Sequence, residues 1–366
     1  MTTLRLGVAG LNRGGALIGQ AARCRHARVA VVCDIDRKKA DARAAQHGVG
    51  TVCYDFDELL RQDIDAVVVA TPITLHAEHV VRALAAGKHV LSEVIVATTV
   101  EDCHRVAAAV AASGKTYMMA ENYCYIRPLT IVENMVKAGL FGEIYYAESD
   151  YLKAFQTNPA FPHIGGWRQP TYFGRRGHPY ITHSLGPVAR IMGERVTRVS
   201  CLAAGKSYPE IKADNTCVLL CQTERGHLIR LRASFISPRP DSFTSYLLQG
   251  TKGCYQAPQG PGDFHKVHLD GVCKPDEWRN VYEFKEYLPA AWNLFPEGTF
   301  ADGNDDDCYR LYDSGTALML DDFALAVLAG GPPPVGVAEA ANWTAAGLLS
   351  ADSVANGGTP VEVPLF

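Results

Sequence analysis

Short apolar runs alternate with amphipathic segments over the first third of the chain. Apolar runs of this length are typical of buried strands, and apolar positions spaced three and four apart are typical of helices. The pattern predicts strands over residues 4–10, 27–36, 65–72, 89–94 and 115–122 and helices over residues 15–24, 75–87 and 100–114. Strands that alternate with helices predict an α/β fold of the Rossmann type, with a doubly wound parallel sheet.

The pattern changes after about Tyr125. A helix over residues 127–144 leads into long β-rich runs with turns between them, and two further helices come near the end. The pattern predicts strands over residues 144–152, 195–204, 215–235 and 243–257 and the late helices over residues 317–330 and 336–358. This half is therefore predicted to be an α+β domain with an open, mainly antiparallel sheet. The expected domains are residues 1–124 and residues 125–366.

Composition adds limits to the possible functions. The 366 residues include 35 basic and 39 acidic side chains, a balance that offers no electrostatic surface for nucleic acid or an anionic membrane. The 11 cysteines are scattered and lack CxxC spacing, so we expect them to be reduced and mostly buried. The first residues enter a strand pattern without a signal-peptide core, and no apolar run approaches the roughly 20 residues of a membrane span. The expected location is the cytoplasm.

The first strand–helix turn carries a glycine-rich sequence, GVAGLNRGG. Aligned to the dinucleotide pattern G-x-G-x-x-G, it supplies Gly10, Asn12 and Gly15, with Arg13 and Gly14 between them. Asn12 departs from glycine, although asparagine tolerates a positive φ better than most residues.

The second predicted strand reaches Asp34, where a Rossmann fold places a carboxylate on the adenosine ribose. A carboxylate there favours NAD and repels a 2′-phosphate, whereas Arg37 keeps NADP as the less favoured alternative. The turn and Asp34 together predict a dinucleotide site.

The stretch RRGHPYITHSLGPV places Tyr180 and His183 three residues apart. On a helix this spacing brings a phenol and an imidazole to one face, where they can form a catalytic pair. Residues of these two types are also often half-buried in cores, so the local sequence leaves both interpretations open.

The segment VVVATPITLHAEHVVRALAAGKHVLSE resembles the signature of the glucose–fructose oxidoreductase/inositol dehydrogenase family, Gfo/Idh/MocA. The matching positions are Thr71, Pro72, His76, residues 86–90 and Glu93. The resemblance implies that Thr71, Pro72, His76 and Glu93 serve the cofactor site. Val94 and Ile95 replace the lysine and proline of the family's E-K-P motif. That lysine helps the reacting hydroxyl lose its proton in many family members, so another group is expected to handle the proton here.

Other residues resemble one branch of this family, the NAD-dependent α-N-acetylgalactosaminidases and related redox-assisted glycosidases. The matches are Glu121–Asn122 and the Y-x-T-H-x-L-G-P motif that contains Thr182, although Ile181 replaces a common proline. The resemblance implies Glu121, Tyr151, Tyr180 and His183 as active-site groups. Asn122 is assigned to the cofactor, and Thr182 is assigned to the substrate.

The expected activity is an NAD-dependent oxidoreductase that removes hydride from a ring carbon of a sugar or glycoside, C3 by resemblance. His183 is the expected base, because a histidine pKa lies near neutrality, and Tyr180 shares or relays the proton. A first alternative is a redox-neutral glycoside hydrolase, in which oxidation permits elimination at C1 with Tyr151 as base, followed by water addition and reduction. A second alternative is a dinucleotide-binding regulator without turnover.

Several weaker expectations complete the set. Trp167 and Arg168, with Arg175 and Arg176 nearby, are candidates for contacts with the sugar. The histidines lack E-x-x-H or H-x-x-x-H spacing, so no metal is expected. Asp302 and residues 305–307 lack EF-hand spacing and read as a solvated loop. The expected partners are a small sugar or glycoside and, by resemblance, further copies of the chain in a dimer or tetramer formed through the sheet.

Overall fold

The computed structural model describes residues 3–153, 174–205, 213–237, 242–260, 262–294 and 308–366. The chain forms two compact units. The first contains residues 1–122, 313–344 and 366, and the second contains residues 123–312 and 345–365. The sequence-based domains place residues 313–344 in the second domain, whereas in the structure this segment packs with the first unit.

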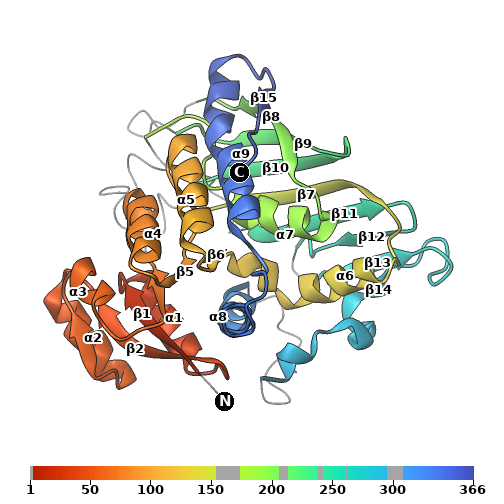
Figure 1. Ribbon diagram of the computed structural model, residues 1–366. Coiled ribbons are helices and arrows are strands. Elements are labelled where there is room, and N and C mark those ends of the chain that lie inside the picture. The colour runs from red at the N-terminus through yellow and green to blue at the C-terminus, as the bar shows by residue number, and fades with distance from the viewer. Residues whose placement is uncertain (1–2, 154–173, 206–212, 238–241, 261, 295–307) are drawn as a thin grey trace. The chain divides into compact units, whose positions relative to one another are not determined.

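The first unit is built on a six-stranded parallel sheet with the order β3-β2-β1-β4-β5-β6 (Figure 1). This order is that of a dinucleotide-binding Rossmann fold, so the predicted fold of this half is confirmed. The strands are β1 (Leu4–Ala9), β2 (Ala27–Cys33), β3 (Thr51–Cys53), β4 (Ala66–Val69), β5 (His89–Ser92) and β6 (Tyr117–Met119). All four residues of β4 are buried, which explains why this central strand appears in the sequence as an unbroken apolar run.

The helices of this unit connect the parallel strands. They are α1 (Arg13–Ala21), α2 (Arg37–His47), α3 (Phe56–Leu60), α4 (His76–Ala85) and α5 (Val100–Ser113). Local chemistry fixes their ends: the side chains of Asp36, Asp55 and Thr99 accept hydrogen bonds from the first turns of α2, α3 and α5. Gly114 ends α5 in the left-handed conformation.

A late segment of the chain returns to this unit. It includes most of α8 (Cys308–Ala329) and the beginning of α9 (Val337–Ala355), which continues into the second unit. The carboxylate of Asp321 accepts hydrogen bonds from the backbone N–H groups of Arg25 and His26, each at 2.9 Å. The N–H of Met119 donates to the carbonyl of Val335 at 3.1 Å. These contacts tie the late segment to the loop before β2 and to the edge strand β6.

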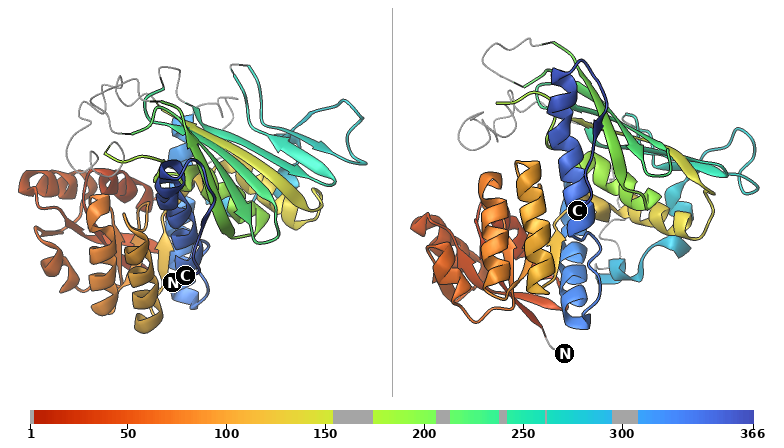
Figure 2. Two further views of the ribbon diagram at one scale, coloured as in Figure 1. Left: turned by 90° about the horizontal axis from the view of Figure 1, so that it is seen from above. Right: turned by 45° about the horizontal axis from the view of Figure 1, so that its top comes forward.

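The second unit contains a nine-stranded mixed sheet with the order β14-β13-β12-β11-β7-β10-β9-β8-β15. Its pairs are antiparallel except for β7 and β10, which run parallel. The predicted open, mainly antiparallel sheet is therefore confirmed, and Figure 2 shows its twist. The strands are β7 (Ile144–Leu152), β8 (Val196–Ala203), β9 (Cys217–Thr223), β10 (Leu228–Ser234), β11 (Ser242–Gly250), β12 (Gly253–Gln256), β13 (Lys266–Leu269), β14 (Arg279–Asn280) and β15 (Val361–Glu362).

Helices cover one face of this sheet. Helix α7 (Thr182–Met192) packs on the central strands β7, β10 and β11, and α6 (Arg127–Lys137) packs beside α7. Short 3-10 turns lie against or near α6: η4 (Val281–Glu283), η5 (Lys285–Tyr287) and η6 (Ala290–Leu294). The strict alternation of buried and exposed residues along β9 shows that the residues the structure describes leave the other face of the sheet open along this strand.

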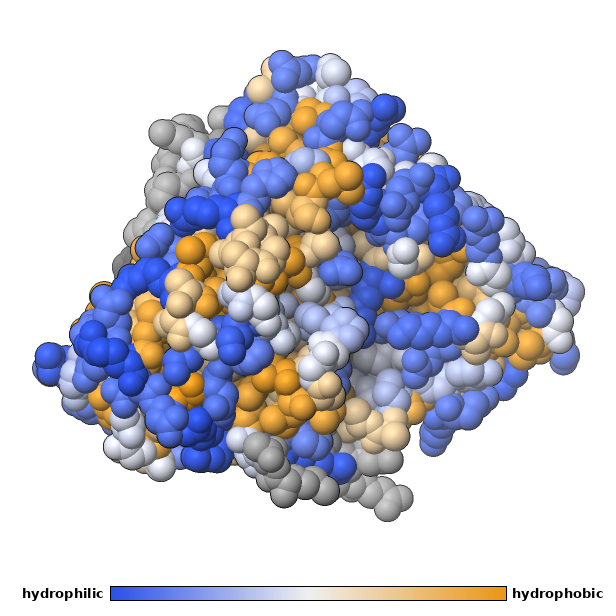
Figure 3. All heavy atoms as spheres, in the orientation of Figure 1, coloured by the Kyte–Doolittle hydropathy of each residue, from blue (hydrophilic) through white to orange (hydrophobic). Residues whose placement is uncertain are grey.

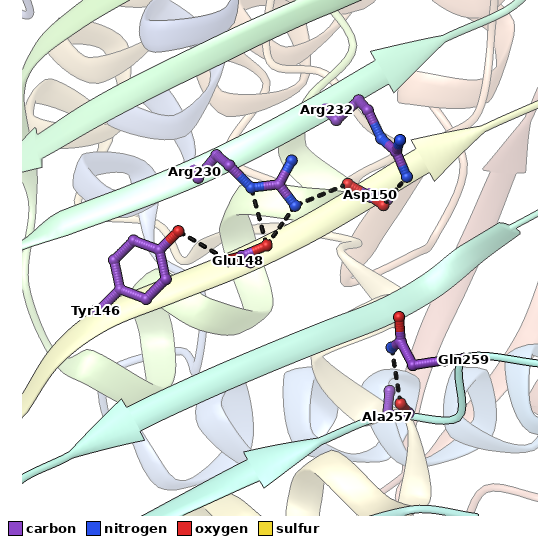
Figure 4. Close-up of polar contacts among 7 residues, drawn as sticks. All are labelled: Tyr146, Glu148, Asp150, Arg230, Arg232, Ala257 and Gln259. Carbon is purple, nitrogen blue, oxygen red and sulfur yellow. Dashed lines mark hydrogen bonds and ion pairs between the residues drawn. The ribbon is translucent and has the colours of Figure 1, made fainter. Parts of the chain in front are cut away.

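Charged side chains on the open face are paired across β7 and β10 (Figure 4). Arg230 donates to Glu148 with Nε at 2.8 Å, and Arg232 pairs with Asp150. The hydroxyl of Tyr146 also donates to Glu148, at 2.7 Å. The two arginines lie directly opposite their carboxylate partners on the neighbouring strand, where side chains interact most strongly, whereas Tyr146 reaches Glu148 along β7 itself.

The surface is mixed in character. Figure 3 shows hydrophilic side chains spread over much of the face in view, with hydrophobic side chains between them. Within the described ranges, no helix is long and apolar enough to cross a membrane.

Candidate active site

The predicted cofactor residues gather at the carboxyl edge of the parallel sheet, where this class of fold binds ligands. Gly10 follows β1 with φ of +85°. A Cβ atom at Gly10 would lie 2.5 Å from the carbonyl oxygen of Ala70, which follows β4. Both constraints admit only glycine, so the first position of the glycine-rich pattern is explained by close approach between two strand ends.

The middle position of that pattern needs a correction. Asn12 has φ of −73° and is exposed, and its side chain does not cap α1. A tolerance of positive φ is therefore not the reason for asparagine here. Gly14 and Gly15 open α1, where added Cβ atoms would lie 2.8 Å from Val8 and from the guanidinium group of Arg43.

Asp34 is held in a defined orientation at the end of β2. One carboxylate oxygen accepts from the N–H of Leu11 at 2.8 Å, and the other accepts from the N–H of Asp36 at 2.9 Å. Lys39 lies 3.5 Å from the first oxygen. The bond to Leu11 joins the predicted ribose carboxylate to the predicted phosphate turn, as a dinucleotide that spans both would require.

The side chains beside Asp34 refine the prediction. Arg37 stacks its guanidinium group on the ring of Tyr54, 4.1 Å from the ring centroid. Ile35 is 88% exposed, so an apolar surface stands directly beside the predicted ribose contact. Sequence reasoning missed Ile35 and Lys39. An isoleucine directly after the acidic residue that ends β2 was the only signal available in the sequence.

Two other predicted groups connect strand ends. The guanidinium of Arg13 donates to Glu93 at 2.8 Å, which ties the start of α1 to the end of β5. His76 is buried, with its ring nitrogens 2.9 Å from the carbonyl of Thr71 and 2.8 Å from that of Ile95. Burial lowers the pKa of His76. His76 thus holds two segments of this edge in place: the Thr71–Pro72 turn and the segment after Glu93. The Thr71–Pro72 turn leads into η1 (Ile73–Leu75).

Glu121 and Asn122 follow β6 at the same edge and are both buried. The amide nitrogen and oxygen of Asn122 have no hydrogen-bond partner among the residues that the structure describes. An unsatisfied buried amide is costly, and a ligand that supplies a donor and an acceptor relieves the cost. The edge therefore offers what a dinucleotide needs: a glycine turn, an oriented carboxylate and an amide without partners.

The predicted proton-transfer residues lie in the second unit and come together there. The hydroxyl oxygen of Tyr180 is 2.9 Å from Nε2 of His183. The ring of Tyr151, from β7, lies 5.6 Å from the His183 ring and 6.1 Å from the Tyr180 ring, measured between centroids. The sequence left open whether Tyr180 and His183 interact, and this geometry brings them into a hydrogen bond.

Two aromatic side chains that sequence reasoning missed complete this cluster. Tyr123, in the short helix η2 (Asn122–Tyr125), stacks on the His183 ring with centroids 4.1 Å apart. Phe235 follows β10 and lies 6.0–6.1 Å from the rings of Tyr180 and Tyr151. We call Tyr123, Tyr151, Tyr180, His183 and Phe235 the aromatic cluster. Nothing in their sequence spacing links Tyr123 or Phe235 to the motif, because both reach it through the fold.

The start of α7 positions the motif. Tyr180 precedes the helix and His183 lies in its first turn, and the hydroxyl of Tyr246 on β11 donates to the carbonyl of His183 at 2.6 Å. The preceding loop is anchored by the buried Asp214, which accepts from the Arg176 side chain at 3.1 Å and from the N–H of Gly177 at 3.0 Å. Helix, strand and loop thus hold the pair from three sides.

Tyr180 and His183 differ in how deeply they are buried. His183 is 3% exposed, whereas Tyr180 is only half-buried. In the described part of the chain, Tyr180 is therefore the more accessible residue of the pair. The arrangement is suited to a relay in which Tyr180 exchanges a proton with an approaching molecule and His183 holds it.

Other predicted residues are less informative. Thr182 is fully buried, and its hydroxyl has no partner in the described part of the chain. Trp167 and Arg168 lie outside the described residues, as do the aspartates at 302 and 305–307. Among described residues, no group of three or more His, Cys, Asp or Glu side chains is placed to hold a metal ion.

Comparison with known families divides the chain in two. Residues 4–121 match the oxidoreductase family with an NAD-binding Rossmann fold, GFO_IDH_MocA. Residues 125–366 match the C-terminal domain of glycosyl hydrolase 109. The first region carries the carboxyl-edge residues except Asn122, and the second carries most of the aromatic cluster.

Curated relatives match over the full chain. Glycosyl hydrolase family 109 proteins of Saccharopolyspora erythraea and Solibacter usitatus are each 30% identical to this chain, and the alignments cover 100% of it and 83% and 88% of the relatives. Among solved structures, levoglucosan dehydrogenase in complex with NADH and levoglucosan superposes with a TM-score of 0.81 at 19% identity, over 99% of this chain and 100% of that one. An oxidoreductase domain protein from Kribbella flavida gives 0.82 at 23% identity over 100% of both chains. At these identities the two structures share the fold.

Proposed function

The chain belongs to glycosyl hydrolase family 109, with the NAD-binding Rossmann domain of the Gfo/Idh/MocA oxidoreductases, and from this premise we propose that it is an NAD-dependent glycoside hydrolase with no net redox change. This activity is the first alternative drawn from the sequence. The family of the curated relatives supports it over a dehydrogenase that stops after hydride removal.

The observation that carries the proposal is the hydrogen bond of 2.9 Å between Tyr180 and His183. Oxidation of a sugar hydroxyl needs an acceptor for the hydroxyl proton. Val94 stands where many Gfo/Idh/MocA members have the lysine that assists this step, and a valine accepts no proton. We propose that the half-buried phenol of Tyr180 and the buried imidazole of His183 supply the missing function.

The chain's own groups perform the first step as a relay. The sugar hydroxyl gives its proton to the Tyr180 oxygen while Tyr180 passes its own proton to His183, and the electron pair of the ring C–H bond leaves as hydride. NAD, when bound by the first unit, would supply the acceptor for this hydride and the donor for the final reduction. A ketone then remains at the sugar carbon, C3 by resemblance.

The ketone makes the neighbouring C–H bond acidic. Tyr151 is the proposed base that removes the C2 proton, and the electron pair forms the C1–C2 double bond as the C1–O bond breaks. As the C1–O bond breaks, Tyr151 passes a proton to the aglycone oxygen, so that Tyr151 ends the step in the protonation state in which it began. Water then adds its hydroxyl group to C1 and a proton to C2, and His183 returns its proton through Tyr180 as the carbonyl is reduced. The products are free sugar and aglycone, with every proton and electron accounted for.

For the cofactor, we propose NAD rather than NADP. The Asp34 carboxylate is oriented by two backbone N–H groups and would repel a 2′-phosphate. Arg37, the side chain that would favour a 2′-phosphate, is stacked on Tyr54 instead.

We also propose that a second copy of the chain covers the open face of the nine-stranded sheet. Leu202, Val218 and Leu220 are exposed there on β8 and β9, at 65%, 36% and 43%. The neighbouring charges are already paired (Figure 4), so covering them costs less than covering isolated charges. Analytical ultracentrifugation tests this, since Leu220→Glu should yield monomers if this face is the interface.

A dual-wavelength assay tests the proposed activity. Purified protein with NAD⁺ meets a panel of nitrophenyl α- and β-glycosides, including N-acetylated sugars, while NADH and nitrophenol are recorded together. We expect nitrophenol release without steady NADH accumulation, and no release after the cofactor is removed. Stoichiometric NADH without nitrophenol would instead identify a dehydrogenase. Bound cofactor with no sugar-dependent signal would favour the regulator.

A further inference from the structure

Tyr123 contacts the rings of His183 and Tyr151 in the aromatic cluster and has no role in the proton relay. Its side chain is buried, and its ring stacks on the His183 imidazole with centroids 4.1 Å apart and an interplanar angle of 23°. We propose that Tyr123 is a positioning residue that fixes the orientation of His183 and stabilises its protonated form. The proposal rests on the function proposed above.

The first part of the argument is geometric. The Tyr246 hydroxyl fixes the backbone carbonyl of His183 at 2.6 Å, which leaves the imidazole free to turn only about its side-chain torsions. The Tyr180 hydroxyl lies at the ring edge, with the two rings perpendicular at 90°. A turn that moves Nε2 away from Tyr180 would drive an edge of the imidazole into the Tyr123 ring. The stack therefore keeps Nε2 aimed at the hydroxyl that it serves.

The second part concerns charge. The proposed relay turns His183 from neutral to cationic during each turnover, in a site where the imidazole is almost fully buried. A buried cation is destabilised unless a partner compensates it. The negative face of an aromatic ring provides such compensation without carrying a charge of its own. A stacked tyrosine thus favours proton acceptance while still allowing the proton to be returned.

A plain packing role makes a different prediction. If Tyr123 only fills space, its replacement should lower stability and reduce the amplitude of NADH formation through the loss of folded protein, while the rate constant of the hydride step and KM stay unchanged. If it positions His183, the rate of the hydride step should fall while substrate affinity persists, and phenylalanine should rescue the rate because it retains the ring.

The experiment compares Tyr123→Phe, Tyr123→Leu and Tyr123→Met in the full chain. Tyr255→Leu is the matched control: Tyr255 is another buried tyrosine of this unit that contacts a histidine, His265, outside the cluster. Single-turnover NADH formation should fall on the order of tenfold in the Leu and Met variants, the size of a lost cation–π contact in a desolvated site, with KM changed less than about twofold. Tyr123→Phe should stay near wild type. Equal hydride rates in all variants, or equal losses in Tyr123→Phe and Tyr123→Leu, would overturn the proposal.

A second readout does not depend on turnover. NMR of ¹⁵N-histidine-labelled protein, with His183 assigned through His183→Gln, reports the tautomer of the imidazole. We expect one dominant tautomer in wild type and Tyr123→Phe and an averaged signal in Tyr123→Leu. If no glycoside is turned over, the proposed function fails but this measurement still decides the role of Tyr123. Identical spectra in wild type and Tyr123→Leu would refute the positioning role.

Discussion

Tyr180→Phe is the most direct test of the proton relay. The substitution removes one oxygen atom and keeps the ring, so the contacts of about 6 Å with the rings of Tyr151 and Phe235 remain. His183 loses a hydrogen-bond partner at 2.9 Å, which should cost about 1–2 kcal/mol of unfolding free energy. Loss of a positioned proton-transfer group should slow the chemical step by about 10²–10⁴-fold, equivalent to about 3–5 kcal/mol in the barrier.

The assay for Tyr180→Phe is stopped-flow single turnover with the cofactor bound and the glycoside saturating. NADH formation reports the hydride step, and nitrophenol release reports cleavage. Tyr146→Phe is the matched control, because it removes a hydroxyl that bonds to Glu148 on the open face at 2.7 Å, outside the aromatic cluster. Urea unfolding of both variants measures the stability cost separately. A Tyr180→Phe variant that forms NADH within about threefold of wild type would show that the proton leaves by another route.

Three further predictions concern the cofactor edge and stability. Gly10→Ala should weaken NAD⁺ binding at least tenfold and destabilise the protein by several kcal/mol, because the new Cβ would lie 2.5 Å from the Ala70 oxygen at a φ of +85°; isothermal titration and urea unfolding test both effects. Asp34→Ser should lower the preference for NAD⁺ over NADP⁺, measured as the ratio of the two Kd values, and an unchanged ratio would remove Asp34 from the ribose site. Burial lowers the pKa of His178 to about 4, so the unfolded chain binds a proton that the folded chain does not, and stability should fall as the pH drops from about 6.5 to 4. His178→Asn should reduce that loss by up to about 3 kcal/mol in unfolding experiments across this range, and an unchanged pH slope would contradict the shift.

Sequence patterns predicted the strands and helices whose buried residues recur at regular spacing or form an unbroken run. The fully buried run of β4 and the glycine-ended helices α4 and α5 were found, and the family resemblance is confirmed. Helix α2 was missed because only Ala40 and Ala44 face the core, so it carries no clear apolar stripe. The predicted helix over residues 127–144 was too long, since α6 ends at Lys137 and a glycine-rich turn follows.

The sequence predicted only those parts of the candidate site whose residues are close to one another along the chain. Tyr180 and His183 share one loop and one helix start, so their spacing was informative. Tyr123 reaches the imidazole from η2, Phe235 reaches the rings of Tyr151 and Tyr180 from the end of β10, and the pairing of β7 with β10 brings Tyr151 beside them. The parallel pairing of these two strands depends on the whole sheet, and no local pattern encodes it.

The redox-neutral proposal places a particular demand on the base. A dehydrogenase needs to accept a proton once per turnover and can release it to solvent, but a cycle that ends in reduction must return the proton to the same oxygen. A carboxylate against His183 would hold the imidazolium strongly and resist the return. The rings of Tyr123 and Tyr151, 4.1 and 5.6 Å from the imidazole, stabilise the cation by less, on the order of 1–2 kcal/mol in total for such contacts. Aromatic neighbours therefore suit a proton that must travel both ways, and a variant with Tyr123→Glu should accumulate NADH during turnover, because oxidation would proceed while the return of the proton is impeded. Absorbance at steady state detects that accumulation. If a folded Tyr123→Glu variant still oxidises substrate but accumulates no NADH, a charge beside His183 does not impede the return of the proton, and this argument is wrong.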